Sequence, residues 1–434
     1  MLHTTPARIV ASAILLLAGP LSASAQTPKP AAGLSPAEKV AGWKVLFDGK
    51  DTSAWRAYKG KAFPDKGWAV KDGVLMTLAD TKGASDIITN DQYGDFELEL
   101  EWAVGPKFNS GIIYRVTETS DTTWQTGPEY QLLDDAGSGI AADDTHAAGA
   151  VYDLIGCSKE KVTKPVGEFN QARIRIRNGV VQHWLNGVKV AEYRNDTDEW
   201  KQKIAASKFK GYAGFGVQPK GHIALQYHDG AVQFRNIRIR DLDAPMPGEV
   251  KLFNGKNLDG LVGFLPDGAK PETVWSVKDG VLICTGKPAG YIYTKDDYKN
   301  YIVKLQWRFD PAKGAGNSGV LLRVSGEHKV WPRSLEAQLQ SGSAGDFWVI
   351  DKIPAKGDPA RTNERNIKHL HPSERPLGEW NEYEIIVDHS KVRLIVNGDT
   401  LNEATDVEEI AGKIALQSEG AEIHFRNFRL APLP

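Results

Sequence analysis

Apolar and polar residues alternate along many short stretches of this chain, with the period of two residues that a β-strand imposes on its two faces. Residues 96–102 read Phe-Glu-Leu-Glu-Leu-Glu-Trp, and residues 301–307 read Tyr-Ile-Val-Lys-Leu-Gln-Trp. We expect each stretch to form a strand with one face in a core and the other in solvent. Helical spacing is almost absent. Only the segment from Asp196 to Phe209 has it roughly, which predicts a short surface helix or lid.

The order of these stretches repeats along the chain, so that one unit occurs twice. The matched pairs, with the first copy named first, are 46–50 and 252–256, 68–75 and 275–282, 109–115 and 317–323, 129–131 and 336–338, 167–170 and 378–381, 185–187 and 396–398, and 234–236 and 425–427. Several pairs contain Asp-Gly or Asn-Gly, which favour tight hairpin turns. Many short strands separated by glycine turns predict an all-β fold of two tandem jelly-roll β-sandwiches.

The first 25 residues have the three parts of a secretory signal peptide, ending in the small residues Ala-Ser-Ala at 23–25. A membrane anchor is the alternative, but Gly19 and Pro20 break the apolar run, which is shorter than the roughly 20 residues of a span. We therefore expect a periplasmic or secreted protein without a membrane span. The expected order is a signal peptide (1–25), a flexible lead-in (26–40), a first sandwich (41–242), a linker (243–248) and a second sandwich (249–434).

Charge and cysteine content narrow the class of protein. The 434 residues include 53 basic and 55 acidic side chains, which are well mixed and give a net charge of −2. Because a basic stripe is missing, we do not expect a nucleic-acid partner. Cys157 and Cys284 are at unmatched places in the two copies, which favours two buried free thiols. A disulfide between them is the alternative in an oxidising compartment.

An arginine ends the same apolar run in both copies. The run that follows Asn109 ends in Arg115, and the run that follows Asn317 ends in Arg323. Asn-Ser-Gly is expected to form a turn before each run. An arginine is unusual at the end of a buried strand unless its guanidinium group meets an anion or a polar ligand. The two arginines are therefore candidate functional residues, and the asparagines are candidate ligands.

A glutamate and a glutamine two residues apart follow in each copy. Glu129 and Gln131 form the first pair, and Glu336 and Gln338 form the second. Residues two apart on a strand point to the same face, so each pair predicts a polar sheet face. A solvated outer face is the simple alternative. Because the pair recurs after the arginine in both copies, we favour a ligand-binding face.

Aromatic residues and one histidine complete the candidate set. The tryptophans at repeat-matched strand positions, which we expect in the core, are Trp68, Trp102, Trp275 and Trp307. The aromatic candidates for stacking on a sugar are Trp124, Tyr152, Trp331 and Trp348. His146 lies in an Asp/Thr/His loop, where solvent exposure and a catalytic role are equally good interpretations. No cofactor is expected with certainty, although a divalent metal held by Glu129, Asp134 and His146 is conceivable.

The seven matched motifs, in this order and in both copies, resemble the 3-keto-disaccharide hydrolase family. The resemblance implies a concanavalin A-like jelly roll that cleaves glycosides already oxidised to a ketone at C3. A C3 ketone acidifies the C2 proton, so that a carboxylate can remove it, the glycosidic oxygen at C1 can leave, and water can add back. On this hypothesis Glu129 is the base, Arg115 and Gln131 stabilise the enolate, and His146 or Asp134 donates the proton.

Three functions stay open at this point. The first is cleavage of 3-keto-glycosides, in which the second copy, with Glu336 and Arg323, is either a second catalytic site or a unit that binds the glycan. A carbohydrate-binding protein without turnover is another reading of the same fold. A conventional glycosidase that uses paired carboxylates, such as Glu129 with Asp134, is the third.

Overall fold

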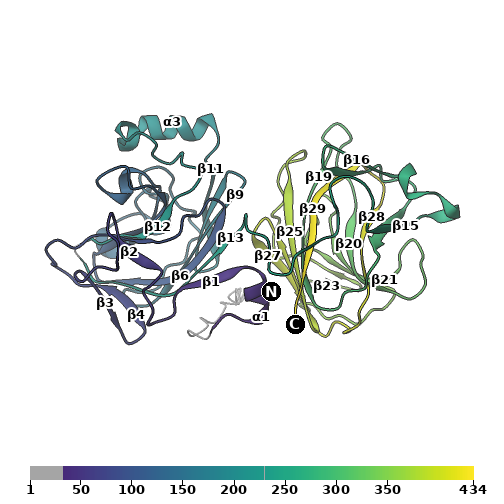
Figure 1. The fold of residues 1–434 in the computed structure, drawn as a ribbon, viewed down its shortest axis with the longest axis horizontal. Helices are drawn as coiled ribbons and strands as arrows, with labels where there is room; N and C mark the ends of the chain where they lie inside the picture. Colours follow the sequence, from purple (N-terminus) through teal and green to yellow (C-terminus); the bar gives the residue numbers. More distant parts are fainter. Residues whose placement is uncertain (1–32, 229) are drawn as a thin grey trace, which may run out of the picture.

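The computed structural model describes residues 33–228 and 230–434, which form four antiparallel β-sheets with few helices (Figure 1). The all-β prediction is confirmed. In these two ranges no helix is long and apolar enough to cross a membrane. The expected signal peptide (1–25) lies outside the described residues, so export stays a prediction. Cys157 and Cys284 are buried free thiols, as expected.

The first half of the chain forms two sheets, here named A and B. Sheet A has the order β11 (Val188–Arg194), β10 (Val180–Leu185), β9 (Asn170–Arg177), β6 (Phe96–Val104), β13 (Val232–Asp241), β4 (Val74–Thr77) and β3 (Trp68–Lys71), with β1 (Trp43–Phe47) on β13. Sheet B has the order β2 (Trp55–Ala57), β5 (Ile87–Thr89), β12 (His222–Leu225), β7 (Asn109–Val116) and β8 (Glu129–Leu133).

The second half repeats this plan in sheets C and D. Sheet C has the order β16 (Trp275–Lys278), β17 (Val281–Cys284), β29 (Ile423–Pro432), β19 (Tyr301–Phe309), β25 (Asn381–Asp388), β26 (Lys391–Val396) and β27 (Asp399–Ala404), with β14 (Val250–Lys251) on β29. Sheet D has the order β15 (Leu261–Phe264), β18 (Gly290–Thr294), β28 (Lys413–Ser418), β20 (Gly319–Ser325), β21 (Arg333–Gln338), β22 (Phe347–Ile350), β24 (Asn366–Ile367) and β23 (Thr362–Asn363).

Helices are few and short. They are α1 (Pro36–Val40), α2 (Asp135–Ser138) and α3 (Asp198–Ala206), with the 3-10 turns η1 (Thr123–Gln125), η2 (Lys208–Gly211), η3 (Pro266–Gly268) and η4 (Pro271–Thr273). The end of the expected flexible lead-in is thus ordered as α1. A capping box between Ser35 and Glu38 begins this helix, and Glu38 also bonds Arg238 on β13 at 2.7 Å. A reciprocal cap and a charged partner stabilise even one turn of helix.

Each pair of sheets encloses an apolar core. The four tryptophans at repeat-matched positions, Trp68, Trp102, Trp275 and Trp307, are all buried, as the sequence predicts. The two cores are also packed alike, since the rings of Trp68 and Phe234 lie 6.2 Å apart and those of Trp275 and Phe425 lie 6.1 Å apart. The repeat in the sequence is therefore also a repeat in the packing of the two cores.

Charged side chains fill the interface between the two halves, where the outer faces of sheets A and C meet. Arg240 on β13 bonds Glu97 on β6 at 2.7 Å and reaches across to Glu384 on β25 at 2.8 Å. Arg175 on β9 crosses to Glu382 on β25. Burial by itself raises the pKa of Glu382, but nearby arginines, led by Arg175, bring it down to about 2. The interface is therefore a paired ionic network.

This network corrects one expectation from the sequence. The polar faces of the strands over 96–102 and 301–307 do not point into solvent, because Glu97 is 2% exposed and Lys304 is 8% exposed. Glu97 pairs with Arg240 and Lys304 pairs with Glu384, and the Arg240–Glu384 pair joins the two faces across the interface. Alternation predicted two unlike faces correctly, but a face covered by a complementary surface has the same pattern as one covered by water.

The predicted surface helix or lid is present as α3 and η2, which pack beside β11 and against the loop that follows β8. Thr197 caps α3 by accepting a bond from Trp200 N at 3.3 Å. The Trp200 ring is buried and donates to Gly216 O at 3.0 Å. Phe209 stacks on Phe215 with ring centroids 4.1 Å apart. These apolar residues cluster with the loop that follows β8, so the lid is anchored over that strand.

Removing the central arginine of the interface tests how much the network contributes. We expect Arg240→Ala to lower the free energy of unfolding by about 3 to 5 kcal/mol, because Glu97 and Glu384 lose a buried partner. Arg393→Ala is the control, since Arg393 pairs with Glu403 at the surface and such a pair contributes at most about 1 kcal/mol. Urea unfolding measures both values. Equal losses in the two variants would contradict the role of the network.

Candidate active site

The Glu129 carboxylate lies on the outer face of sheet B, away from the core. Tyr130 and Leu132 on the same strand point into the core, so Glu129 and Gln131 share the opposite face, as predicted. Although it faces outward, Glu129 is only 8% exposed. The Gln131 amide, with its nitrogen turned toward Glu129, donates to Glu129 Oε1 at 3.0 Å and to Ser110 O at 3.3 Å.

A glycine on the neighbouring strand makes room for this carboxylate. A Cβ atom added to Gly111 on β7 would lie 2.2 Å from Glu129 Oε1, and one added to Gly319 on β20 would lie 2.3 Å from Glu336 Oε1. Neither glycine has a left-handed backbone, so each is needed for space. The expected turn does not form, because Asn-Ser-Gly begins β7 in the first copy, and in the second copy Asn317 forms isolated β-bridges just before β20 begins at Gly319. The Ser110 hydroxyl bonds Gln226 O at 2.8 Å.

Burial raises the pKa of Glu129 to about 8. The nearby Asp86 carboxylate contributes to this rise, and the Lys208 ammonium group on η2 opposes it. In the second half, burial and then Glu419 raise the pKa of Glu336 to about 8, while Arg365 opposes the shift. Each half thus holds a dehydrated glutamate near a second carboxylate, which raises the pKa of the glutamate, and a cation, which lowers it.

An aromatic ring and a cation accompany the glutamate in each half. Tyr152 N donates to Glu129 O at 3.0 Å, and Lys208 Nζ lies 4.1 Å from the Tyr152 ring centroid. In sheet D, Trp348 is directly opposite Glu336 on the next strand. The Arg365 guanidinium lies 5.2 Å from the Trp348 ring. Tyr152 and Trp348 thus lie beside the two glutamates.

The two cations were not among the residues singled out from the sequence. Lys208 belongs to the lid segment and Arg365 to the loop before β24, so the elements that supply them are unrelated. A signal existed for Lys208, because the segment over 196–209 was expected to form a short surface helix or lid. For Arg365 the only signal was a basic loop that leads toward His371.

His146 and Trp124 lie at the edges of the first site. The His146 ring is 5.0 Å from the Tyr152 ring, with Nδ1 2.8 Å from Asp144 and Nε2 3.2 Å from Asp153. Trp124 packs edge-on against Tyr212 with centroids 5.2 Å apart, between the lid and sheet B.

The proposed role of the two arginines is wrong. Arg115 donates to Gly94 O at 3.0 Å and pairs with Asp95 at 3.4 Å. Arg323 is fully buried and bonds only backbone carbonyls, among them His389 O at 2.5 Å. Both arginines have a positive φ, 55° and 54°, next to a register shift in their strand pairing. The bulge turns the guanidinium group onto neighbouring loops, which it holds together.

Asp134 is also committed to backbone groups. Its carboxylate caps α2 by accepting from Gly137 N at 3.0 Å, and it accepts from Lys107 N at 2.9 Å. It is therefore unsuited to the expected roles of proton donor and second glycosidase carboxylate. The conceived metal site of Glu129, Asp134 and His146 is not assembled either. The described residues hold one group of three possible metal ligands, namely Asp310, Glu422 and His424.

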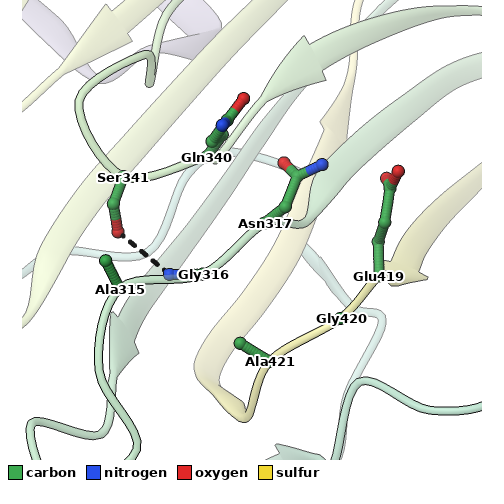
Figure 2. A pocket seen from close by; sticks show the side chains of 8 residues that line it. All are labelled: Ala315, Gly316, Asn317, Gln340, Ser341, Glu419, Gly420 and Ala421. Carbon is green, nitrogen blue, oxygen red and sulfur yellow. Dashed lines mark hydrogen bonds between the residues drawn. The ribbon is translucent and has the colours of Figure 1, made fainter.

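In the second half, an open pocket of about 340 Å³ lies beside Glu336 and is lined by Asn317, Gln340 and Glu419, among others. Figure 2 shows these three side chains rising on the same side of the backbone. Within the described ranges, Glu336 Oε1, Asn317 Oδ1 and both amide atoms of Gln417 are buried without a hydrogen-bond partner. Buried polar atoms of this kind are rare unless a ligand or water meets them.

The other candidates of the second half are arranged less like the first. Gln338 Oε1 accepts from the backbone amides of Leu339 and Gln340, both at 2.8 Å, and so does not support Glu336. Trp331 is 54% exposed at the rim, where its indole bonds Glu419. His369 Nδ1 lies 2.6 Å from Asp346 Oδ1.

Comparison with known proteins agrees with this duplicated sandwich. The family model described as a 3-keto-alpha-glucoside-1,2-lyase-like domain matches residues 42–240 and again 248–431. A protein of Bacteroides thetaiotaomicron named 3-keto-disaccharide hydrolase is 32% identical over 231 residues, which are 46% of this chain and 79% of that protein.

Two crystal structures from Parabacteroides distasonis, both assigned as glycosyl hydrolases, are also similar. One is 32% identical and covers 49% of this chain and 99% of its own, with a TM-score of 0.45. The other is 31% identical and covers 46% and 99%, with a TM-score of 0.36. The family model and the Bacteroides relative identify the protein as a carbohydrate-cleaving enzyme. It belongs to the 3-keto-disaccharide hydrolase family, and the split match fits two tandem copies.

Gly111→Ala tests whether space over the glycine holds Glu129 in its dehydrated place. We expect the added methyl group to push the carboxylate toward water, so that its pKa falls from about 8 toward the ordinary value of about 4.3. Stability should change little, because the atom in the way is the end of a flexible side chain. Carbon-13 NMR titration of the glutamate carboxyls measures the shift.

Gly33→Ala is the matched control, since nothing lies within 4 Å of a Cβ atom at Gly33. This variant should leave the Glu129 titration unchanged. An unaltered pKa of about 8 in Gly111→Ala would show that the glycine has no part in positioning the carboxylate.

Proposed function

We propose that the enzyme cleaves glycosides whose sugar has been oxidised to a ketone at C3, and that Glu129 is the base that removes the C2 proton. One observation supports this most: Glu129 is a buried carboxylate with a raised pKa on the face of sheet B, beside an aromatic ring and a cation. The family of the relatives fits the same substrate class.

The reaction balances without an external oxidant. Glu129 takes the C2 proton, and the electrons of the C2–H bond form the enolate of the C3 ketone. The enolate electrons then make a C1–C2 double bond while the C1–O bond breaks, and the departing oxygen takes a proton from an acid. Water adds across the double bond, giving oxygen to C1 and a proton to C2. The net reaction is hydrolysis, and no oxocarbenium ion forms.

The environment of Glu129 suits this step. A carboxylate with a pKa near 8 is a stronger base than an exposed one, and it reacts at mildly alkaline pH without being consumed by protonation. Lys208 takes the place that Arg115 was expected to fill. Its ammonium group favours the ionised carboxylate and can attract the negative enolate oxygen once the proton has moved.

His146 is the group we assign as proton donor to the leaving oxygen. Its ring is beside Tyr152 at 5.0 Å, and contacts with the carboxylates of Asp144 and Asp153 hold the ring at the edge of the site. Trp124 and Tyr152 offer apolar surface on which a sugar ring can stack. We assign Glu336 the same role as Glu129 in the second half.

A conventional glycosidase is the second candidate, and one observation favours it. Asp86 is close enough to Glu129 to raise its pKa, so two carboxylates do share the first site. A glycosidase uses such a pair on unoxidised glycosides. Parallel assays with a 3-keto-disaccharide and its unoxidised parent separate the candidates, because only a glycosidase cleaves the parent. A carbohydrate-binding protein cleaves neither.

Replacing both glutamates tests the base assignment. We expect Glu129→Gln/Glu336→Gln to lose turnover of a 3-keto-disaccharide by about 10² to 10⁴-fold, since no carboxylate remains to take the C2 proton. Each single variant should keep the share of the other half. Glu118→Gln, which alters a carboxylate paired with Arg56, should turn over normally. Near wild-type turnover in the double variant would sink the assignment.

The pH profile tests the contribution of Lys208. Because the base works only when ionised, turnover should rise with pH through about 8, the pKa of Glu129. Lys208 lowers this pKa, so Lys208→Ala should move the rising limb of the profile to higher pH. The profile is measured in a protein that also carries Glu336→Gln, so that only the first site contributes to turnover. A limb that stays in place or moves to lower pH would contradict the proposed role.

A further inference from the structure

A second pocket lies between the two halves of the chain, and neither Glu129 nor Glu336 lines it. It measures about 350 Å³ and is lined on one side by β10 and β11 of the first half. Residues 372–376, Glu379 and Asn397 of the second half form the other side. It exists only because the two copies pack together, so a relative with a single copy cannot form it.

One cation in this crevice has no partner. Lys189 pairs with Glu192 at 2.8 Å, and Arg194 pairs with Asp196 at 2.7 Å. The guanidinium group of Arg375 is half-buried, yet among the described residues no hydrogen bond or ion pair is made by it. Burial and then Arg175 lower the pKa of Arg375, and Glu192 and Glu379 oppose this shift only in part.

A buried amide in the same crevice lacks a partner as well. Gln182 is 2% exposed, and its Nε2 donates to Glu192 Oε2 at 2.8 Å. This bond fixes the orientation of the amide and leaves Oε1 as the acceptor. Gln182 Oε1 is buried and accepts no hydrogen bond from the residues that the structure describes. A buried acceptor without a donor is destabilising by about 1 to 3 kcal/mol.

The unpaired guanidinium group of Arg375 and the unpaired oxygen of Gln182 together define the chemistry of a ligand. Arg375 requires acceptor oxygens, and Gln182 Oε1 requires a donor. A hydroxyl group is both, whereas a carboxylate or phosphate is an acceptor only. An anion would also meet the negative charges of Glu192 and Glu379, which lie near enough to act on Arg375. Neighbouring hydroxyls on a sugar ring match the planar guanidinium fork without that repulsion.

We propose that the crevice between the two halves binds a neutral carbohydrate, whose hydroxyl groups accept from Arg375 and donate to Gln182. This site would hold a sugar without reacting with it, because neither Glu129 nor Glu336 lines it. It is independent of the reaction proposed above, and it gives the tandem arrangement a binding surface of its own.

Hydrogen–deuterium exchange on the full-length protein tests the proposal, with sucrose as the neutral probe. Addition of sucrose should slow exchange in peptides that cover 189–194 and 372–379. Arg375→Ala should weaken this protection about tenfold or more in sucrose concentration, because a charged hydrogen bond is lost. Arg375→Lys keeps the charge but loses the fork, and should weaken it as well. Arg393→Ala removes a surface arginine paired with Glu403 and should leave it unchanged.

Three outcomes would overturn the proposal. Sucrose could fail to protect either peptide, or protection could persist at the same concentration in Arg375→Ala. Protection by inorganic phosphate or glucuronate in place of sucrose would show an anion site. Because the readout is local to the crevice and needs no turnover, it stands or falls separately from the assignment of Glu129.

Discussion

The candidate site depends on a side chain that lies across a neighbouring backbone. Glu129 and Glu336 fold over Gly111 and Gly319, and this close approach removes the carboxylates from water although they are on the outward face of a sheet. The raised pKa follows from that dehydration. A Cβ on the adjacent strand would displace the carboxylate, so one missing methyl group per half sets the basicity of the site.

A second constraint comes from the buried ionic interface. The outer faces of sheets A and C carry charges that would be costly to bury alone, and they are buried because each half supplies the partners of the other. Arg240 between Glu97 and Glu384 is the clearest example. The two sandwiches are thereby held in one arrangement. The crevice around Arg375 is a gap in that otherwise paired surface.

Local pattern was enough to predict the architecture and half of the site. The repeats, the core tryptophans, the lid and the shared face of Glu129 and Gln131 all follow from periodicity, which is a property of neighbouring residues. Arg115 was misassigned because its guanidinium group bonds the backbone of a distant loop, and Asp134 because its carboxylate caps the helix that follows it. The missed cation Lys208 is 79 positions from Glu129 in the sequence, and only the fold brings its charge to bear on the carboxylate.

The two halves present similar carboxylates behind different entrances. In the first, α3 and η2 pack over Glu129, and the lid itself brings the cation Lys208. In the second, the segment between β27 and β28 contains no helix, the pocket beside Glu336 is open, and Arg365 comes from another loop. Elements that do not correspond between the two halves thus supply the same feature, a cation next to a buried glutamate and an aromatic ring. The two sites differ in the space left for the substrate. The duplication therefore allows the two sites to accept substrates of different size.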